Sequence, residues 1–165
     1  MNDPRMIIGI DPGDTTGLAV WVSATDNWRM YQVGPCKDDE QLKKVLVTLS
    51  DVVTHVEPFG PGSEGCIHIV LEPFQFRKDD SYRDKIDYIA AEVIGAIRVW
   101  AYERSFVRLI MQGASYGVEG FWSDEKVKKI GLWLRGKRHA MDATEHVLMY
   151  RTFKLNDQSL LMLLR

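Results

Sequence analysis

Acidic residues stand at the ends of two apolar segments, where strands would deliver them to an edge of the core. The run IIGID ends in Asp11, and the run IHIVLE ends in Glu72. In RHAMDATEH, His139 and Asp142 are three residues apart, so a helix would carry them on one face, and His146 lies one turn further along. Carboxylates and an imidazole from two strands and a helix are the set that a pair of Mg²⁺ ions requires.

Two such ions, about 3.5–4 Å apart, clamp a scissile phosphate, activate a water and stabilise the leaving 3′ oxygen. The residues therefore favour phosphodiester hydrolysis. Plainer interpretations stay open, because acids commonly end strands and Asp11 would also start a hairpin turn. His139 and Asp142 would equally suit a helix cap or an exposed helix face.

An alternating series of strands and helices must position these residues. The turn PGDTTG separates the first two strands, and the first three strands form an antiparallel meander. Helices and strands then alternate, which predicts an α/β fold with a mixed five-stranded sheet flanked by helices. We expect strands at 6–11, 16–22, 28–34, 67–72 and 106–111, and helices from 38 or 39 to 56, at 84–103, at 124–130 and from 138 past Tyr150.

The composition is that of an ordinary globular protein. The chain has 165 residues, 45% hydrophobic and 27% charged, so we expect a single domain over residues 1–165. The formal net charge of −2 leaves only a local basic patch for a nucleic acid. The N-terminus lacks a signal-peptide layout, and no apolar run reaches membrane-spanning length. Cys36 and Cys66 lack metal-type spacing, so we expect free thiols in a reducing compartment, the cytoplasm.

Several segments resemble the RuvC family of Holliday-junction resolvases, which are RNase H-like nucleases. GIDPGDTTGLAVW resembles the family's first motif, in which G-x-D-P-G precedes a T-G-hydrophobic stretch. IVLEPF resembles the strand-4 glutamate segment, and HAMDA resembles the C-terminal H/D-x-x-D motif in its His form. IDYIAAEVIGAIRVWAYE stands where the family has its Gly-containing dimer helix. The resemblance spans roughly residues 6–150, and GKRHAMDATEH is most similar to short RuvC-like proteins encoded by phages.

The resemblance implies an RNase H-like fold and a crossover junction endodeoxyribonuclease with two Mg²⁺ or Mn²⁺ ions in each site. Its metal ligands, which are also its catalytic residues, would be Asp11, Glu72, His139 and Asp142. Asp11 would bridge both ions, and Glu72 and Asp142 would each hold one. His139 would ligate the second ion or position its water.

A homodimer would nick four-way DNA junctions symmetrically, in the host cytoplasm if a phage encodes the protein. The helix at 84–103 would form the dimer interface, although packing on the sheet alone would also explain it. The apolar tail SLLMLLR is a second candidate for the interface.

Basic residues gather directly before His139. The 13 positions from 126 to 138 hold six of them and no acid: Lys126, Lys128, Lys129, Arg135, Lys137 and Arg138. We expect these residues to contact DNA phosphates, although a basic face is usually just a solvated one. The loop after Glu72 adds the candidate DNA contacts Phe74, Phe76, Arg77 and Lys78. Either phenylalanine would stack on an unpaired base or cover the core edge, and neither stands at the family's usual third position after Glu72.

Three other functions stay open. The turn DPGDTTG superficially fits the phosphate-binding hairpin of actin-like and sugar-kinase proteins, but 165 residues supply only one of their two lobes. A flap, replication-fork or RNA-processing nuclease of the same fold would use identical metal chemistry on other substrates. A junction-binding subunit would keep the fold without catalysis, although the intact acid set argues against that loss.

Overall fold

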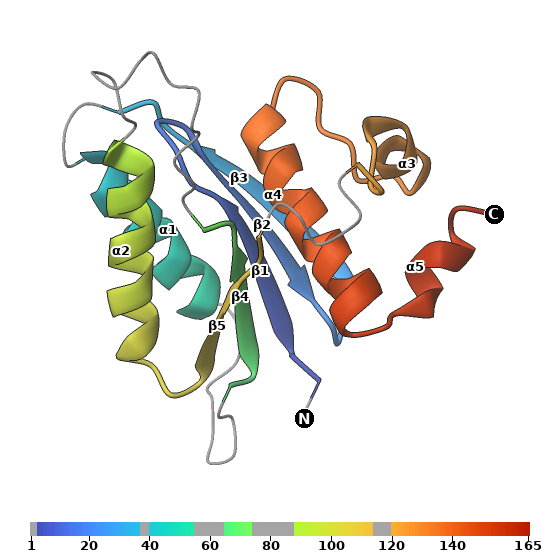
Figure 1. Cartoon of the computed structure of the whole chain (residues 1–165), viewed down its shortest axis with the longest axis horizontal. Helices are drawn as coiled ribbons and strands as arrows, with labels where there is room; N and C mark the ends of the chain where they lie inside the picture. The colour runs from blue at the N-terminus through green and yellow to red at the C-terminus, as the bar shows by residue number, and fades with distance from the viewer. Residues whose placement is uncertain (1–2, 37–39, 55–64, 74–87, 114–119) are drawn as a thin grey trace.

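The computed structural model describes residues 3–36, 40–54, 65–73, 88–113 and 120–165. Its strands are rich in β-branched and aromatic residues and form one mixed sheet in the order β3-β2-β1-β4-β5 (Figure 1). Their bounds are β1 Met6–Asp11, β2 Thr16–Val22, β3 Asn27–Val33, β4 Ile67–Leu71 and β5 Val107–Met111. β1 is the central strand, antiparallel to β2 and parallel to β4.

The register brings the carboxyl ends of β1 and β4 to the same edge of the sheet. Asp11 lies opposite Gly17 on β2, and Ile10 lies beside Leu71 on β4. Glu72, which directly follows β4, is therefore in line with Asp11. The parallel direction of the two strands is what places both acids at one end.

Helices cover both faces of this sheet (Figure 1). The helices α1 and α2 lie on one face and α4 lies on the other, with α3 and α5 beyond α4. A π-helical turn, η2, continues α4. The bounds are α1 Glu40–Thr54, α2 Tyr88–Tyr102, α3 Asp124–Lys129, α4 Arg138–Met149, η2 Tyr150–Lys154 and α5 Gln158–Met162.

The alternation of side chains along β1 assigns each residue to one of these layers. Ile8 and Ile10 are fully buried in the core shared with α1 and α2. Ile7 is fully buried in the smaller core shared with α4. Because successive side chains of a strand point to opposite faces, Gly9 and Asp11 share the α4 face with Ile7.

A third cluster ties the C-terminal elements together around the buried Trp122. Leu148 of α4 and Leu160 of α5 both pack into it. The indole Nε1 of Trp122 also donates a hydrogen bond to Oγ1 of Thr152 at 3.2 Å. Part of the apolar tail SLLMLLR is thus packed within the chain, while Met162 in that tail is 67% exposed.

The predicted architecture is confirmed as an α/β fold with three antiparallel strands followed by parallel ones. β4 and β5 are each one residue shorter than predicted at one end, and β3 is shifted by one residue, to Asn27–Val33 from the predicted 28–34. The predicted ends of α1 and the predicted start of α2 at 84–87 lie outside the described residues. Sequence periodicity predicted neither α5 nor the π-helical form of η2. No helix in the described ranges is both long and apolar enough to cross a membrane.

Candidate metal centre

Two glycines let α4 lie directly on the sheet beside Asp11. A Cβ added at Gly17 would overlap the carbonyl oxygen of His139, and one added at Gly9 would overlap that of Ala143. Ala143 is itself fully buried, so the contact is between small residues on both sides. Because Gly17 is the cross-strand neighbour of Asp11, this close approach holds His139 next to Asp11.

Asp11, His139 and Asp142 converge into one group. Nδ1 of His139 lies 2.8 Å from Oδ2 of Asp11. Asp142 reaches the pair from one turn further along α4, and the three residues offer ligand atoms that all lie within 4.8 Å of one another. The side chains of Asp11, His139 and Asp142 are 22%, 42% and 43% exposed, so a ligand from solution can reach them.

The two carboxyl groups of this site are destabilised in their charged form. Burial raises the pKa of Asp11, a hydrogen bond with His139 opposes the shift, and the nearby Asp142 adds to it. Burial also raises the pKa of Asp142, against the charges of Arg138 and His139. A cation between two desolvated, mutually repelling carboxylates would stabilise both charged forms.

The chemistry of the donor set fits a divalent cation. Mg²⁺ accepts a few carboxylate oxygens and keeps several waters, and the partial exposure of the group leaves room for those waters. The imidazole of His139 adds a nitrogen donor, which is better suited to transition metals than to Mg²⁺. Asp11, His139 and Asp142 are therefore the residues that could hold the ion.

Glu72 lies beside this group without joining it. Its Oε2 atom is 3.9 Å from Nε2 of His146, which follows Asp142 by about one helical turn. Burial lowers the pKa of His146 to about 4, so its ring is neutral at physiological pH. The role of Glu72 as a metal ligand stays a prediction, while its place at the end of β4 is as expected.

Sequence reasoning missed Glu145 as a residue of this region. Burial, followed by the charges of Asp142 and Asp124, raises its pKa to about 7. Glu145 lies three residues after Asp142, so the spacing that linked His139 to Asp142 would also have found it. A carboxyl group that titrates near neutral pH is a candidate for proton exchange at a site.

Hydrogen bonds from α1 fix the turn that follows Asp11. The amide Nε2 of the buried Gln41 donates to the carbonyl of Val33 at 2.9 Å and to Oγ1 of Thr16 at 3.1 Å. Thr16 in turn donates to the carbonyl of Gly13 at 3.0 Å. Thr16 thus stabilises the turn.

The predicted basic patch separates into two parts, and the lysines of α3 form the first. Nζ of Lys126 donates to the carbonyl of Phe121 at 2.6 Å, and Lys129 donates to the carbonyl of Leu164. Lys128 lies over an indole ring, with its Nζ 4.3 Å from the ring centroid. All three lysines therefore have partners within the chain, and their contact with DNA stays a prediction.

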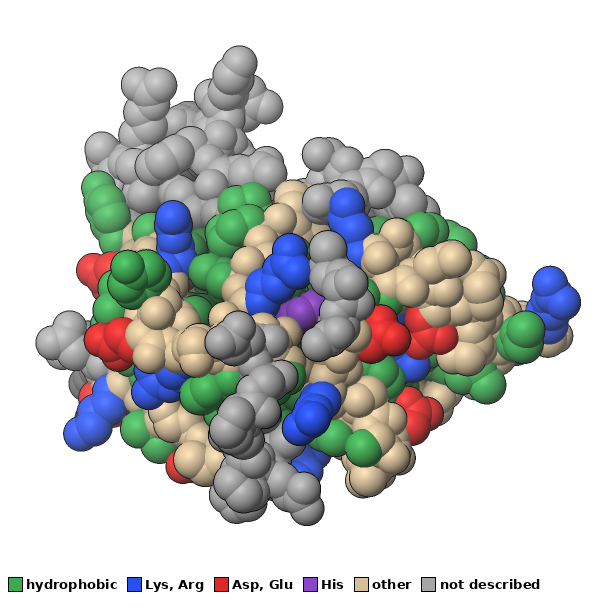
Figure 2. All heavy atoms as spheres, turned by 90° about the horizontal axis from the view of Figure 1, so that it is seen from below, with side chains coloured by type: hydrophobic (Ala, Val, Ile, Leu, Met, Phe, Trp, Pro, Cys, Tyr) green, Lys and Arg blue, Asp and Glu red, His purple; other side chains and the backbone are tan. Residues whose placement is uncertain are grey.

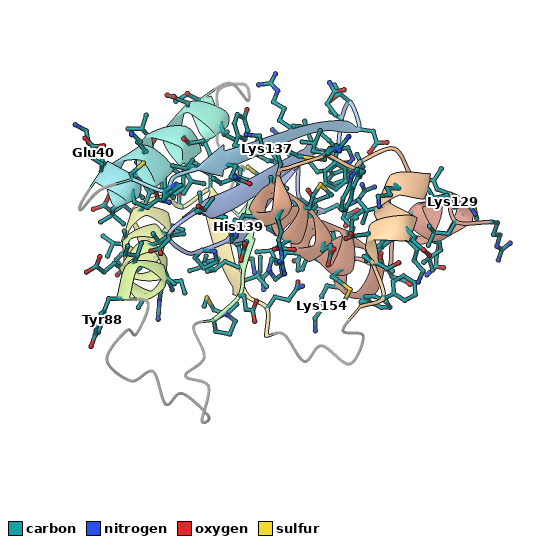
Figure 3. All side chains as sticks on the ribbon, turned by 90° about the horizontal axis from the view of Figure 1, so that it is seen from above. Glu40, Tyr88, Lys129, Lys137, His139 and Lys154 are labelled. Atoms are coloured by element: carbon teal, nitrogen blue, oxygen red, sulfur yellow. The ribbon has the colours of Figure 1, made fainter. Side chains whose placement is uncertain are left out.

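The second part consists of the connector before α4 and the first residue of α4, where Arg135, Lys137 and Arg138 are exposed. Nε of Arg138 lies 3.9 Å from Oδ2 of Asp142. Figure 3 shows Lys137 close to His139 at the start of α4, whereas Lys129 lies far from both. At the opposite end of the molecule, Figure 2 shows described basic and acidic side chains interspersed rather than gathered by sign. The predicted contacts Phe74, Phe76, Arg77 and Lys78 lie outside the described residues.

Comparison with known proteins identifies no family for this chain. No family model matches the sequence, and a search of curated proteins finds no match.

Proposed function

We propose that the protein is a metal-dependent, structure-specific DNA endonuclease of the RuvC type, with an RNase H-like fold, that nicks four-way junctions. The observation that carries this proposal is the convergence of Asp11, His139 and Asp142. These residues come from a strand end and a helix start that are far apart in the sequence. They are also three of the four positions at which the sequence resembles the metal ligands of that family.

The proposed reaction is hydrolysis of a phosphodiester that leaves 5′-phosphate and 3′-hydroxyl ends. When bound, Mg²⁺ or Mn²⁺ would activate the attacking water and stabilise the charge on the leaving oxygen. Asp11 and Asp142 would hold the ions. His139 would give up its hydrogen bond with Asp11 and would then either ligate an ion or position a water molecule of that ion. Glu72 would supply the fourth ligand from the end of β4.

The exposed connector before α4 would guide the DNA backbone to this centre. Arg135, Lys137 and Arg138 would pair with phosphates that flank the scissile one, because they lie just before α4 or at its first residue. A patch of this kind supplies binding through counterion release and does not read the bases. The structure of the junction, rather than its sequence, would thus determine where the protein binds.

Symmetric nicking requires two sites, and α2 offers a surface for a second copy of the chain. Tyr88, Val99 and Tyr102 are 65%, 62% and 93% exposed on this helix. Gly95 lies between them, and a Cβ there would meet only open space. A second α2 helix could approach closely at Gly95 and bury the three larger side chains. The proposed homodimer would use this face of α2. We further propose that the protein acts in the cytoplasm, where reduced thiols and a DNA substrate are both expected.

The deciding experiment is cleavage of a labelled four-way junction with Mg²⁺ or Mn²⁺, with duplex, flap and three-way DNA as controls. We expect paired symmetric nicks, and Asp11→Asn should reduce the rate by about a hundredfold or more while junction binding remains. Asp14→Asn is the matched control, because Asp14 is an exposed acid of the same turn.

The same assay separates the other candidate functions. Cutting of flaps and forks as efficiently as junctions would widen the function to a general branched-DNA nuclease. Tight junction binding without any cleavage by the wild type would contradict the enzymatic proposal and favour a binding subunit.

A further inference from the structure

One polar side chain is buried in the otherwise apolar inner face of α1. Gln41 is only 1% exposed, and the other buried residues of this helix are valines and a leucine. The amide oxygen Oε1 of Gln41 is buried and has no hydrogen-bond partner among the residues that the structure describes. A buried acceptor without a partner lowers stability, and an apolar side chain of similar shape would avoid that cost. The contribution of Gln41 must therefore lie in its donor group.

The donor group of Gln41 connects α1 to two other segments. Its Nε2 atom donates to the carbonyl of Val33, the last residue of β3, at 2.9 Å. It also donates to Oγ1 of Thr16 at 3.1 Å and to the carbonyl of Gly13 at 3.4 Å. One amide therefore ties α1 both to the end of β3 and to the turn between β1 and β2.

This turn begins directly after Asp11 and relies on side-chain hydrogen bonds. Pro12, which follows Asp11, has no backbone N–H, so it cannot donate to the ladder with β2. The carbonyl of Gly13 instead accepts hydrogen bonds from the side chains of Gln41 and Thr16. These two side chains thus fix the backbone immediately beyond the candidate metal ligand.

The packing around Gly34 leaves the amide of Gln41 no other position. A Cβ added at Gly34 would overlap both Oε1 of Gln41 and the carbonyl oxygen of Asp14, which belongs to the same turn. The amide group and the turn therefore lie against one backbone position from two sides. A shift of the turn would require a shift of Gln41 as well.

Asp11 is consequently held from both faces of the sheet. Successive residues of β2 point to opposite faces: Gly17 makes room for the carbonyl of His139 on the α4 face, while Thr16 bonds to Gln41 on the α1 face (Figure 1). Gly17 is the ladder partner of Asp11, and Thr16 directly precedes Gly17. The contact with α4 brings His139 to Asp11, and the contact with α1 fixes the backbone on either side of the hairpin.

We propose that Gln41 is a positioning residue of the candidate metal centre. From the face of the sheet opposite to the ligands, it holds the turn after Asp11 in the shape that directs the Asp11 carboxylate toward the ion. The inference rests on the proposed metal-dependent function and deepens it, because it assigns control of metal affinity to a helix that contributes no ligand. Hydrogen bonds that orient a ligand in this way commonly change metal affinity by about 10–100-fold.

Metal affinity and stability, measured separately, test this role. Gln41→Met keeps the length of the side chain and removes both the donor and the unpartnered oxygen. We expect it to weaken Mn²⁺ binding by at least about tenfold, measured by electron paramagnetic resonance of the free ion, while the urea midpoint changes little. Val45→Ala is the matched control, because Val45 is fully buried on the same helix. It should lower the urea midpoint through a cavity and leave the Mn²⁺ affinity of the folded protein unchanged.

Thr16 provides a second route that also applies if Gln41→Met fails to fold. Thr16→Val keeps the shape and removes the hydroxyl that joins Gln41 to Gly13, so it should weaken Mn²⁺ binding as well. Thr16→Ser retains the hydroxyl and should restore wild-type affinity. Because both residues act through one network, the double variant of Gln41→Met and Thr16→Val should lose less affinity than the product of the two single losses.

Unchanged Mn²⁺ affinity in both Gln41→Met and Thr16→Val would overturn the inference. An equal loss of affinity in Val45→Ala would also overturn it, because the effect would then follow stability alone.

These results are distinguishable from a failure of the proposed function. If the wild type cleaves junctions and Gln41→Met binds Mn²⁺ normally, only the positioning role is wrong. If the wild type binds Mn²⁺ with the expected losses in the variants but cuts no DNA, the positioning role stands and the nuclease proposal fails. A wild type that binds no Mn²⁺ would overturn both.

Discussion

The carbonyl oxygen of His139 occupies the space that a side chain at position 17 would need. Gly17 is paired with Asp11 across the β1–β2 ladder, so the same contact that seats the start of α4 also sets the distance between His139 and Asp11. The absence of a side chain at Gly17 is thus a geometric requirement of the candidate metal centre.

Replacing Gly17 with alanine should therefore damage the site as well as the fold. Overpacking of this kind costs about 1–3 kcal/mol, and α4 must move away from β2 to relieve it. We expect Gly17→Ala to lower the free energy of unfolding in urea by this amount. It should also weaken the binding of Mn²⁺ to the candidate metal centre, because the movement of α4 carries His139 and Asp142 away from Asp11. Gly113→Ala is the control, since a Cβ at Gly113 meets only open space. Unchanged stability and metal affinity in Gly17→Ala would contradict the close packing.

The pH dependence of stability should reveal two opposing groups on α4. Burial and the nearby acids raise the pKa of Glu145 from 4.5 to about 7, so the folded state holds a proton that the unfolded state loses. This effect decreases stability as pH rises through that window. Burial lowers the pKa of His146 from 6.5 to about 4, which increases stability as pH rises from about 4 to 6.5. The two slopes largely cancel in the metal-free wild type.

Single substitutions should reveal how each of these two groups changes the free energy of unfolding with pH. For Glu145→Gln, we expect the free energy of unfolding to increase more steeply with pH from about 4 to 6.5 than in the wild type, because the opposing titration of Glu145 is removed and that of His146 remains. For His146→Leu, we expect it to decrease between about pH 4.5 and 7. Urea denaturation in the presence of a chelator measures both profiles. Parallel profiles for the wild type and the two variants would show that neither group is perturbed.

The dependence of DNA affinity on salt should distinguish the two parts of the basic patch. Lys137→Gln should weaken junction binding and reduce the slope of log affinity against log salt by about 1, because one phosphate contact is lost. Lys129→Gln should leave that slope unchanged, since Lys129 is engaged with the carbonyl of Leu164. Equal effects of the two substitutions would show that α3 also contacts DNA.

The buried Arg151 should be the main anchor of the C-terminal elements. Its Nη2 donates to Oδ2 of Asp157 at 2.6 Å, and its guanidinium carbon lies 3.8 Å from the ring centroid of Trp21. Arg151→Met would leave Asp157 without this partner and should cost about 3 kcal/mol in thermal or urea unfolding. Arg138→Met, an exposed arginine on the same helical segment, should change stability little. A fully stable Arg151→Met protein would show that apolar packing alone holds the segment.

The exposed face of α2 predicts a specific change in oligomeric state. Val99→Arg should weaken dimerisation by at least about tenfold in light scattering after size-exclusion chromatography, because it introduces a desolvated charge. Val47→Arg is the matched control, because Val47 is 50% exposed on α1 rather than α2. A wild type that stays monomeric at all concentrations, or a Val99→Arg protein that dimerises normally, would exclude this interface.

Local patterns were sufficient to predict the architecture and part of the site. Alternating apolar residues bounded by glycine-rich turns located the strands, and helical periodicity located α1, α2 and α4. Strand ends then identified Asp11, and i,i+3 spacing identified His139 and Asp142 as one face of a helix. The structure brings these three residues together, because short-range rules fix each element and the parallel strands fix their common edge.

Long-range partners account for what the sequence did not predict. No local pattern indicates that Lys129 bonds to the tail or that the turn after Asp11 depends on Gln41. Gly17 lies within β2, as predicted, but no local pattern indicates that its missing side chain makes room for α4. Such features depend on which elements pack together in three dimensions, and an isolated segment does not contain that information.

The separation of Asp11 and His139 by 128 residues has a consequence for how the protein is made. Synthesis proceeds from the N-terminus, so β1 emerges from the ribosome long before α4 exists. Until α4 docks against Gly9 and Gly17, a growing or truncated chain has Asp11 without the histidine and the second carboxylate that complete the centre. If the centre cuts DNA, the fold delays that activity until α4, residues Arg138–Met149, has been translated and has docked.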